Sequence, residues 1–207
     1  MTRRLPLIPT ILVAAAVALM IWLGVWQVHR LHWKEALLAR YNANLSLPEI
    51  ALPIGSTDQS LLFRHATAFC LRPVGWTTEA GRDRDGNVGW RQIAHCATGA
   101  EGPGFLVQLG IAKDPEARPA WTGGKVSGFI SHAPDHRPLI ALMLGKGGPK
   151  RLMLVADAPP PGLAPNAGPD LSAVPNNHLA YAVQWFLFAG IAVVIYVLAL
   201  RKRWRTR

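Results

Sequence analysis

The stretch LAYAVQWFLFAGIAVVIYVLAL occupies residues 179–200 and contains no formally charged side chain. As an α-helix, these 22 residues would extend about 33 Å, close to the thickness of the hydrocarbon core of a bilayer. A basic segment of residues 201–207 follows directly. The sequence therefore predicts a transmembrane helix over 178–200 and a cytoplasmic tail over 201–207.

A histidine and two aromatic residues stand at the beginning of this helix. His178, Tyr181 and Trp185 share one helical face, because they are spaced three and four residues apart. This face is a candidate site at the membrane boundary. On residue type alone, His178 also suits an interfacial or helix-capping position, and Tyr181 and Trp185 also suit an aromatic membrane belt.

A second apolar run lies near the N-terminus, over residues 5–26. It ends in the bulky sequence WLGVW rather than in a small-residue cleavage site, which favours an uncleaved transmembrane helix after a cytoplasmic tail of residues 1–4. Helical spacing continues beyond it at Trp22, Trp26, His29 and Trp33, beside a polar stripe of Gln27, Arg30 and Lys34. The helix is therefore expected to continue to about residue 40.

The basic residues are concentrated at the two ends of the chain. The formal net charge is +10, but seven of the 22 basic residues lie in the two tails, leaving 15 basic against 12 acidic residues between them. This distribution indicates the positive-inside rule and not a nucleic-acid partner. Both termini are expected in the cytoplasm. The absence of a transit peptide before the first span favours a two-pass protein of the bacterial inner membrane with a periplasmic central domain.

The central domain, residues 41–158, is predicted to be mainly β, a small barrel or sandwich within an α+β arrangement. Short strand-like segments with Gly and Pro punctuation occur at 63–71, 88–96, 105–111, 125–130, 139–144 and 151–155. Residues 159–175 are rich in proline and poor in large apolar residues. We expect this segment to be an extended tether to the last helix.

Two cysteines, Cys70 and Cys96, lie in different predicted strands. In an oxidising periplasm, an inter-strand disulfide is the favoured interpretation. The Cys-x-x-Cys motif of thiol oxidoreductases is absent from the sequence. A copper site formed by both cysteines with His95 stays open as an alternative.

Two segments resemble the signatures of the Surfeit-locus-one (SURF-one-like) family of cytochrome c oxidase assembly factors. Residues 24–34, GVWQVHRLHWK, match the first signature, Gly-x-Trp-Gln-x-x-Arg-x-x-x-Lys. The second signature is similar to residues 176–186, NNHLAYAVQWF. Between them, residues 126–129 are compatible with a family strand. Residues 106–113, LVQLGIAK, lack the arginine and tryptophan of the family pattern, so no role of that strand is transferred to this chain.

The resemblance implies a non-enzymatic membrane protein that binds or delivers haem a during maturation of the catalytic subunit of a haem-copper oxidase. It implies His178 as the iron ligand, Tyr181 and Trp185 as packing groups, and Arg30 as the partner of a haem propionate. Arg30 can equally pair with Glu35 or with lipid phosphate. The expected partners are the catalytic subunit, haem a synthase and membrane lipid.

Two alternatives belong to other classes of function. One is a membrane scaffold that binds the nascent oxidase subunit through its helices and never contacts haem. The other is a periplasmic copper or thiol carrier that uses Cys70 and Cys96.

Overall fold

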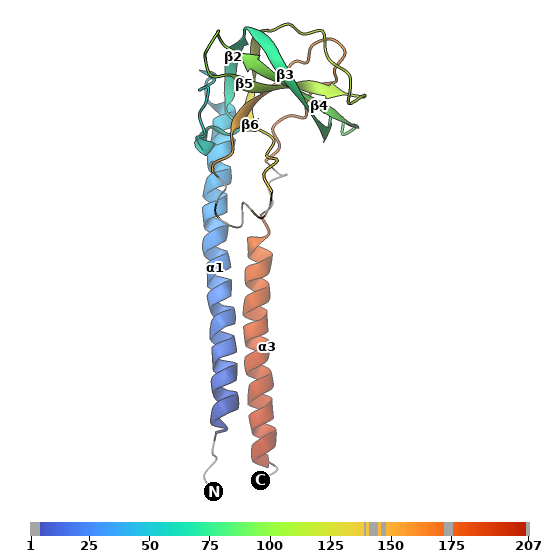
Figure 1. The fold of residues 1–207 in the computed structure, drawn as a ribbon. Coiled ribbons are helices and arrows are strands. Elements are labelled where there is room, and N and C mark those ends of the chain that lie inside the picture. Colours follow the sequence, from blue (N-terminus) through green and yellow to red (C-terminus); the bar gives the residue numbers. More distant parts are fainter. Residues whose placement is uncertain (1–4, 139, 141–144, 146–147, 172–175, 206–207) are drawn as a thin grey trace. The chain divides into compact units, whose positions relative to one another are not determined.

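The computed structural model describes residues 5–138, 140, 145, 148–171 and 176–205. The chain divides into two compact units. The first unit contains residues 1–38 and 174–207, and the second contains residues 39–173. Two long helices form the first unit, and a β-sheet forms the second (Figure 1).

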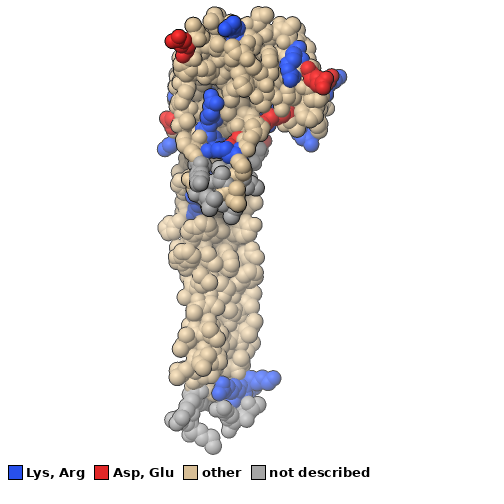
Figure 2. Space-filling model, viewed as in Figure 1, with Lys and Arg blue, Asp and Glu red and all other residues tan. Residues whose placement is uncertain are grey.

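The first unit contains helix α1, Leu7–Ser46, which continues into the second unit, and helix α3, His178–Arg205. The two helices are antiparallel: Gln27, near the middle of α1, bonds His178 at the start of α3, while Thr10, at the start of α1, bonds Tyr196 farther along α3. Both are long and apolar enough to cross a membrane. On the face seen in Figure 2 they carry a long band without charged side chains, and Lys and Arg lie at the end of α3.

Small residues form the contact between α1 and α3. Gly24 is buried, as are Ala182 and Ala189. A Cβ atom added at Gly24 would lie 2.7 Å from Cε1 of Phe186, so the absence of a side chain at Gly24 makes room for this ring. Large apolar side chains elsewhere on both helices are exposed, as expected for a surface that faces lipid.

The second unit is built on one mixed sheet of seven strands in the order β1-β2-β6-β7-β5-β4-β3. Its neighbours pair antiparallel except for β1 with β2 and β5 with β7, which are parallel. The strands are β1, Ile50–Ala51; β2, His65–Cys70; β3, Arg72–Arg82; β4, Val88–Ala97; β5, Phe105–Ala112; β6, Gly124–His132; and β7, Leu152–Ala156. A 3₁₀ turn at Gln59–Leu61 precedes β2.

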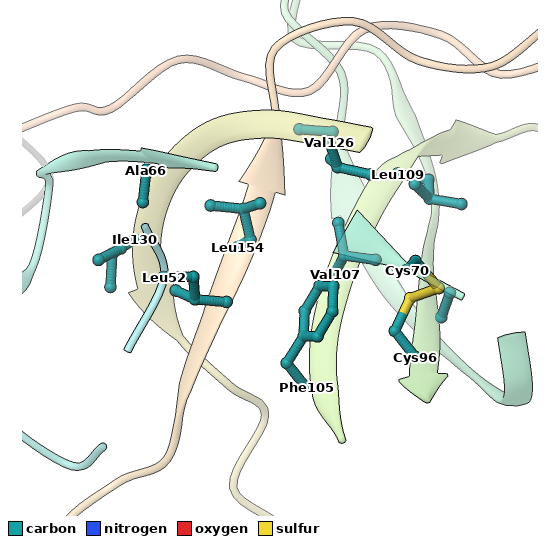
Figure 3. Packing of buried hydrophobic residues seen from close by; sticks show 12 residues of the cluster. Leu52, Ala66, Cys70, Cys96, Phe105, Val107, Leu109, Val126, Ile130 and Leu154 are labelled. Atoms are coloured by element: carbon teal, nitrogen blue, oxygen red, sulfur yellow. A yellow bond between two sulfur atoms is a disulfide. The ribbon is translucent and has the colours of Figure 1, made fainter. Parts of the chain in front are cut away.

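A disulfide between Cys70 and Cys96 shows that this sheet curls. The two cysteines lie on β2 and β4, with β6, β7 and β5 between them in the sheet order. In a flat sheet these strands would be about 19 Å apart, since neighbouring strands are spaced by about 4.8 Å. Their Cα atoms are only 5.2 Å apart. The sheet therefore folds back on itself around a buried apolar cluster that includes both sulfurs (Figure 3).

Most of the predicted strands are present, but the sheet contains strands that were not expected, and both helices extend beyond their expected ends. Strands β1 and β3 were not expected from the sequence, and the pairing of β3 with β4 is the longest in the sheet. Helix α1 continues to Ser46 rather than to about residue 40, and α3 continues to Arg205 rather than ending at residue 200. The strand expected at 139–144 lies, apart from Ile140, outside the described residues.

The proline-rich segment 159–175 is not a free extended tether along its first half. Ala164 forms an antiparallel bridge with Ile111, and Asn166 forms one with Asp83. Asn166 is buried, and its side chain bonds Gln108 and the backbone oxygen of Ala156. The chain is therefore fixed to the sheet as far as Asn166. Residues 172–175 lie outside the described part of the chain.

Candidate functional site

The candidate site in the first unit centres on His178, the first residue of α3. Its Nδ1 lies 2.8 Å from Oε1 of Gln27 on α1. Its Nε2 bonds no described residue. The bond connects two segments that the sequence marks as candidates, one near the middle of α1 and one at the start of α3, so these two segments are in contact.

Tyr181 and Trp185 follow His178 along α3. Tyr181 is exposed, and its backbone nitrogen donates to the oxygen of Asn177. Trp185 is half-buried and forms an edge-to-face contact with Phe188, with 6.3 Å between ring centroids. Both aromatic rings are therefore at least partly exposed, and they lie within two turns of His178 on α3.

Arg30 lies one helical turn beyond Gln27 on α1. Its guanidinium carbon is 4.1 Å from the centroid of the Trp33 ring, a cation–π arrangement. Glu35, one of the partners considered for Arg30, instead contacts Nδ1 of His32 at 3.4 Å. Within the described residues Arg30 forms no ion pair, and no hydrogen bond joins it to His178, Tyr181 or Trp185. The structure thus joins His178 to α1 through Gln27 and not through Arg30.

Gln27 is the residue that sequence reasoning did not single out. It was placed in a polar stripe with Arg30 and Lys34, although it occupies a fixed position of the first signature. Gln27 directly follows a long apolar run, and burying an amide in an apolar environment costs free energy unless the amide forms a hydrogen bond. This requirement for a partner could have identified Gln27 as a candidate from the sequence.

The two cysteines lie in the second unit and bond each other. Both are buried in the core of the sheet, with exposures of 0% and 1%. The neighbouring His95 lines a pocket of 320 Å³, and its Nε2 lies 2.7 Å from Oγ1 of Thr77. Among the residues that the structure describes, no group of three or more His, Cys, Asp or Glu side chains is arranged to hold a metal ion. The predicted disulfide is therefore present, and neither sulfur is a free thiol.

Together, the two units define a protein in which two long apolar helices flank a β-sheet domain in the sequence. Its candidate polar site lies between the two helices, and the exposed apolar side chains of these helices suit a membrane.

The chain belongs to the SURF1 family, whose sequence model matches residues 14–190. It is 24% identical over 216 aligned residues to a SURF1-like protein of Monosiga brevicollis, covering 87% of this chain and 83% of that protein. It is 26% identical over 221 aligned residues to a SURF1-like protein of Drosophila melanogaster, covering 87% of this chain and 74% of that protein. Membership of this family implies a role in the assembly of cytochrome oxidase.

Proposed function

We propose that this protein is a membrane-anchored, non-enzymatic assembly factor that holds haem a through His178 before the haem enters the catalytic subunit of cytochrome c oxidase. Family membership supports the oxidase as the target. The observation that carries the haem-binding part is the hydrogen bond between Gln27 and His178, because it brings both family signatures into one site.

The residues present fit one side of a haem. When bound, haem a supplies an iron that takes a neutral imidazole nitrogen as an axial ligand. Nε2 of His178 bonds no described residue, so it is available for that role. Tyr181 is exposed and Trp185 is half-buried on the same helical face, and both offer aromatic surface for a flat macrocycle.

Arg30 is the proposed partner of a haem propionate. It is three residues, about 4.5 Å along the helix axis, from Gln27 and hence close to the level of His178. Stacking on Trp33 orders its guanidinium while leaving the N–H groups free to donate to a carboxylate. A charge-assisted pair at a membrane boundary is stronger than the same pair in water.

The proposed function also specifies how the protein lies in the membrane and which proteins it contacts. We place the protein in a bacterial inner membrane. The basic ends of the chain support a two-pass arrangement with both termini in the cytoplasm and the β domain in the periplasm. The catalytic subunit receives the haem, and haem a synthase is the proposed donor. The exposed apolar faces of α1 and α3 are available to lipid and to the helices of these partners.

The test uses cells that lack the gene and make haem a. They are restored with the native protein, with His178→Ala, or with His29→Ala as a matched control on the exposed surface of α1. Membranes are then assayed for the catalytic subunit and for its haem a. We expect His178→Ala membranes to contain the subunit with little haem a, while His29→Ala matches the native protein. Full haem a content with His178→Ala would favour the scaffold instead.

A further inference from the structure

The hydrogen bond between Gln27 and His178 has a defined direction. With Oε1 of Gln27 placed 2.8 Å from Nδ1 of His178, the amide oxygen accepts and Nδ1 donates. A neutral imidazole carries one proton, and here that proton is on Nδ1. Nε2 then holds a lone pair, and it bonds no described residue. The bond therefore selects one of the two tautomers of the histidine.

We propose that Gln27 is a positioning residue, which holds His178 as the Nδ1-protonated tautomer and presents its Nε2 as the metal-binding atom. Metal-binding histidines generally donate their other ring N–H to a fixed acceptor, which sets the tautomer and the ring orientation. The role of Nε2 toward haem iron rests on the proposed function. The tautomer itself does not, because it follows from the contact in the protein alone.

The packing of the helices supports this role for Gln27. Gly24 precedes it by one turn, and the ring of Phe186 occupies the space where a larger residue would place its side chain. Ala182, one turn after His178, is buried. Close approach of the helices at these two positions is consistent with the Gln27 side chain reaching the imidazole across the interface. Both partners are half-buried, so the bond is partly shielded from solvent.

The first test needs no haem. The protein is labelled with ¹⁵N-histidine, placed in detergent micelles, and the His178 signals are assigned by their loss in His178→Ala. The ¹⁵N shifts distinguish a protonated from an unprotonated ring nitrogen. We expect a protonated Nδ1 in the native protein and in Gln27→Glu, which keeps an acceptor. In Gln27→Leu we expect a shift toward protonated Nε2, whereas Gln184→Leu, on the exposed surface of α3, leaves the signals unchanged. Equal tautomer populations in the native protein and Gln27→Leu would overturn the proposal.

The second test uses haem a, titrated into the same five proteins, including His178→Ala, and followed by its visible spectrum. Loss of a supporting hydrogen bond typically weakens metal binding by about 10- to 100-fold. We expect that loss in Gln27→Leu and its reversal in Gln27→Glu. Haem binding through His178 with no effect of Gln27→Leu would overturn the role of Gln27 and leave the proposed function standing. A tautomer shift in proteins that bind no haem would overturn the proposed function and retain the tautomer control by Gln27.

Discussion

Gly24 on α1 faces the ring of Phe186 on α3, and a Cβ atom at Gly24 would come within 2.7 Å of that ring. This contact stands one turn from the bond between Gln27 and His178. Helices in a membrane associate through close packing and interhelical hydrogen bonds, because lipid is as apolar as their side chains. We therefore expect the spacing of α1 and α3 at Gly24 to determine whether Gln27 and His178 can form their hydrogen bond.

Gly24→Leu is expected to separate the helices at the site. A Cys pair introduced at Gln27 and His178 reports this distance by disulfide cross-linking, since the two native cysteines are already bonded to each other. We expect slower cross-linking with Gly24→Leu and recovery when Phe186→Ala is added, because the smaller side chain returns the space. An unchanged rate with Gly24→Leu would show that this contact does not set the helix spacing.

Removing the disulfide is expected to lower the stability of the β domain without abolishing oxidase assembly. Replacing Cys70 and Cys96 by Ala avoids burying hydroxyl groups in the core, and we expect the free energy of unfolding to fall by about 2 to 5 kcal/mol. Urea titrations followed by tryptophan fluorescence measure this loss. A reductant should destabilise the native protein and leave the double variant unchanged. Loss of oxidase assembly by a stably folded double variant would instead favour a copper or thiol carrier.

Gly128 on β6 is expected to tolerate no side chain. An added Cβ atom would lie 1.9 Å from the backbone oxygen of Val155 on the neighbouring strand β7, which cannot move without breaking the ladder. We expect Gly128→Ala to destabilise the protein by about 3 kcal/mol or more. Gly99→Ala is the control, because no atom lies within 4 Å of its Cβ position, and its effect should stay within about 0.5 kcal/mol. Similar unfolding midpoints for the two variants would contradict the observed strand spacing.

His132 is expected to make stability depend on pH near neutrality. Burial, followed by the charge of Lys150, lowers the pKa of His132 from its usual value of 6.5. The unfolded chain therefore binds this proton more readily than the folded protein. Stability from the neutral imidazole is complete above about pH 6.5 and is lost as the pH falls toward the lowered value.

Unfolding midpoints of the native protein and His132→Gln between pH 7.5 and pH 5 measure this effect, with His136→Gln as an exposed control. We expect a smaller decrease for His132→Gln than for the other two proteins. The lowered pKa values of Asp58 and Asp83 act in a separate window, because hydrogen bonds from Ser60 and Asn87 hold them below their usual 3.8. Parallel pH profiles for all three proteins would rule out the contribution of His132.

The two long helices could be predicted from the sequence because a bilayer imposes one strong requirement, a continuous apolar run of sufficient length. Their ends could not. The last turns of α1 are fixed by Asn44, whose side chain donates to the backbone oxygens of Ser60 and Leu62. The last turn of α3 carries basic side chains that favour a helix C-terminus. A hydropathy profile reports neither the hydrogen bonds of Asn44 nor the stabilisation of a helix end by basic side chains.

Strand β3 was missed because its sequence contains Pro73, Gly75 and Gly81 and shows no clear alternation. The structure accounts for all three. β3 is an edge strand with a register shift between Pro73 and Gly75, where proline is tolerated. At Gly81 the side chain of Arg91 from β4 occupies the place of a Cβ atom. These compensations depend on the neighbouring strand and cannot be seen in the segment itself.

The structure of the proline-rich segment 159–175 also depends on residues outside the segment. Its composition predicts an extended chain, but Gln108 is buried in β5 and requires a polar partner. Oδ1 of Asn166 accepts from Nε2 of Gln108 at 2.8 Å, and this pairing between residues distant in the sequence fixes the segment to the sheet.

For the candidate site, the signatures pointed to His178 and Arg30. The contact between Gln27 and His178 joins residues 151 positions apart, so it became visible only in the fold.

The most direct test of the account is the ratio of haem a to protein after co-expression with the enzymes of haem a synthesis and purification in detergent. We predict a ratio near one for the native protein and for His29→Ala, and a much lower ratio for His178→Ala. Native protein that purifies without haem a, or that holds as much haem a after His178→Ala, would contradict the claim that His178 binds the iron.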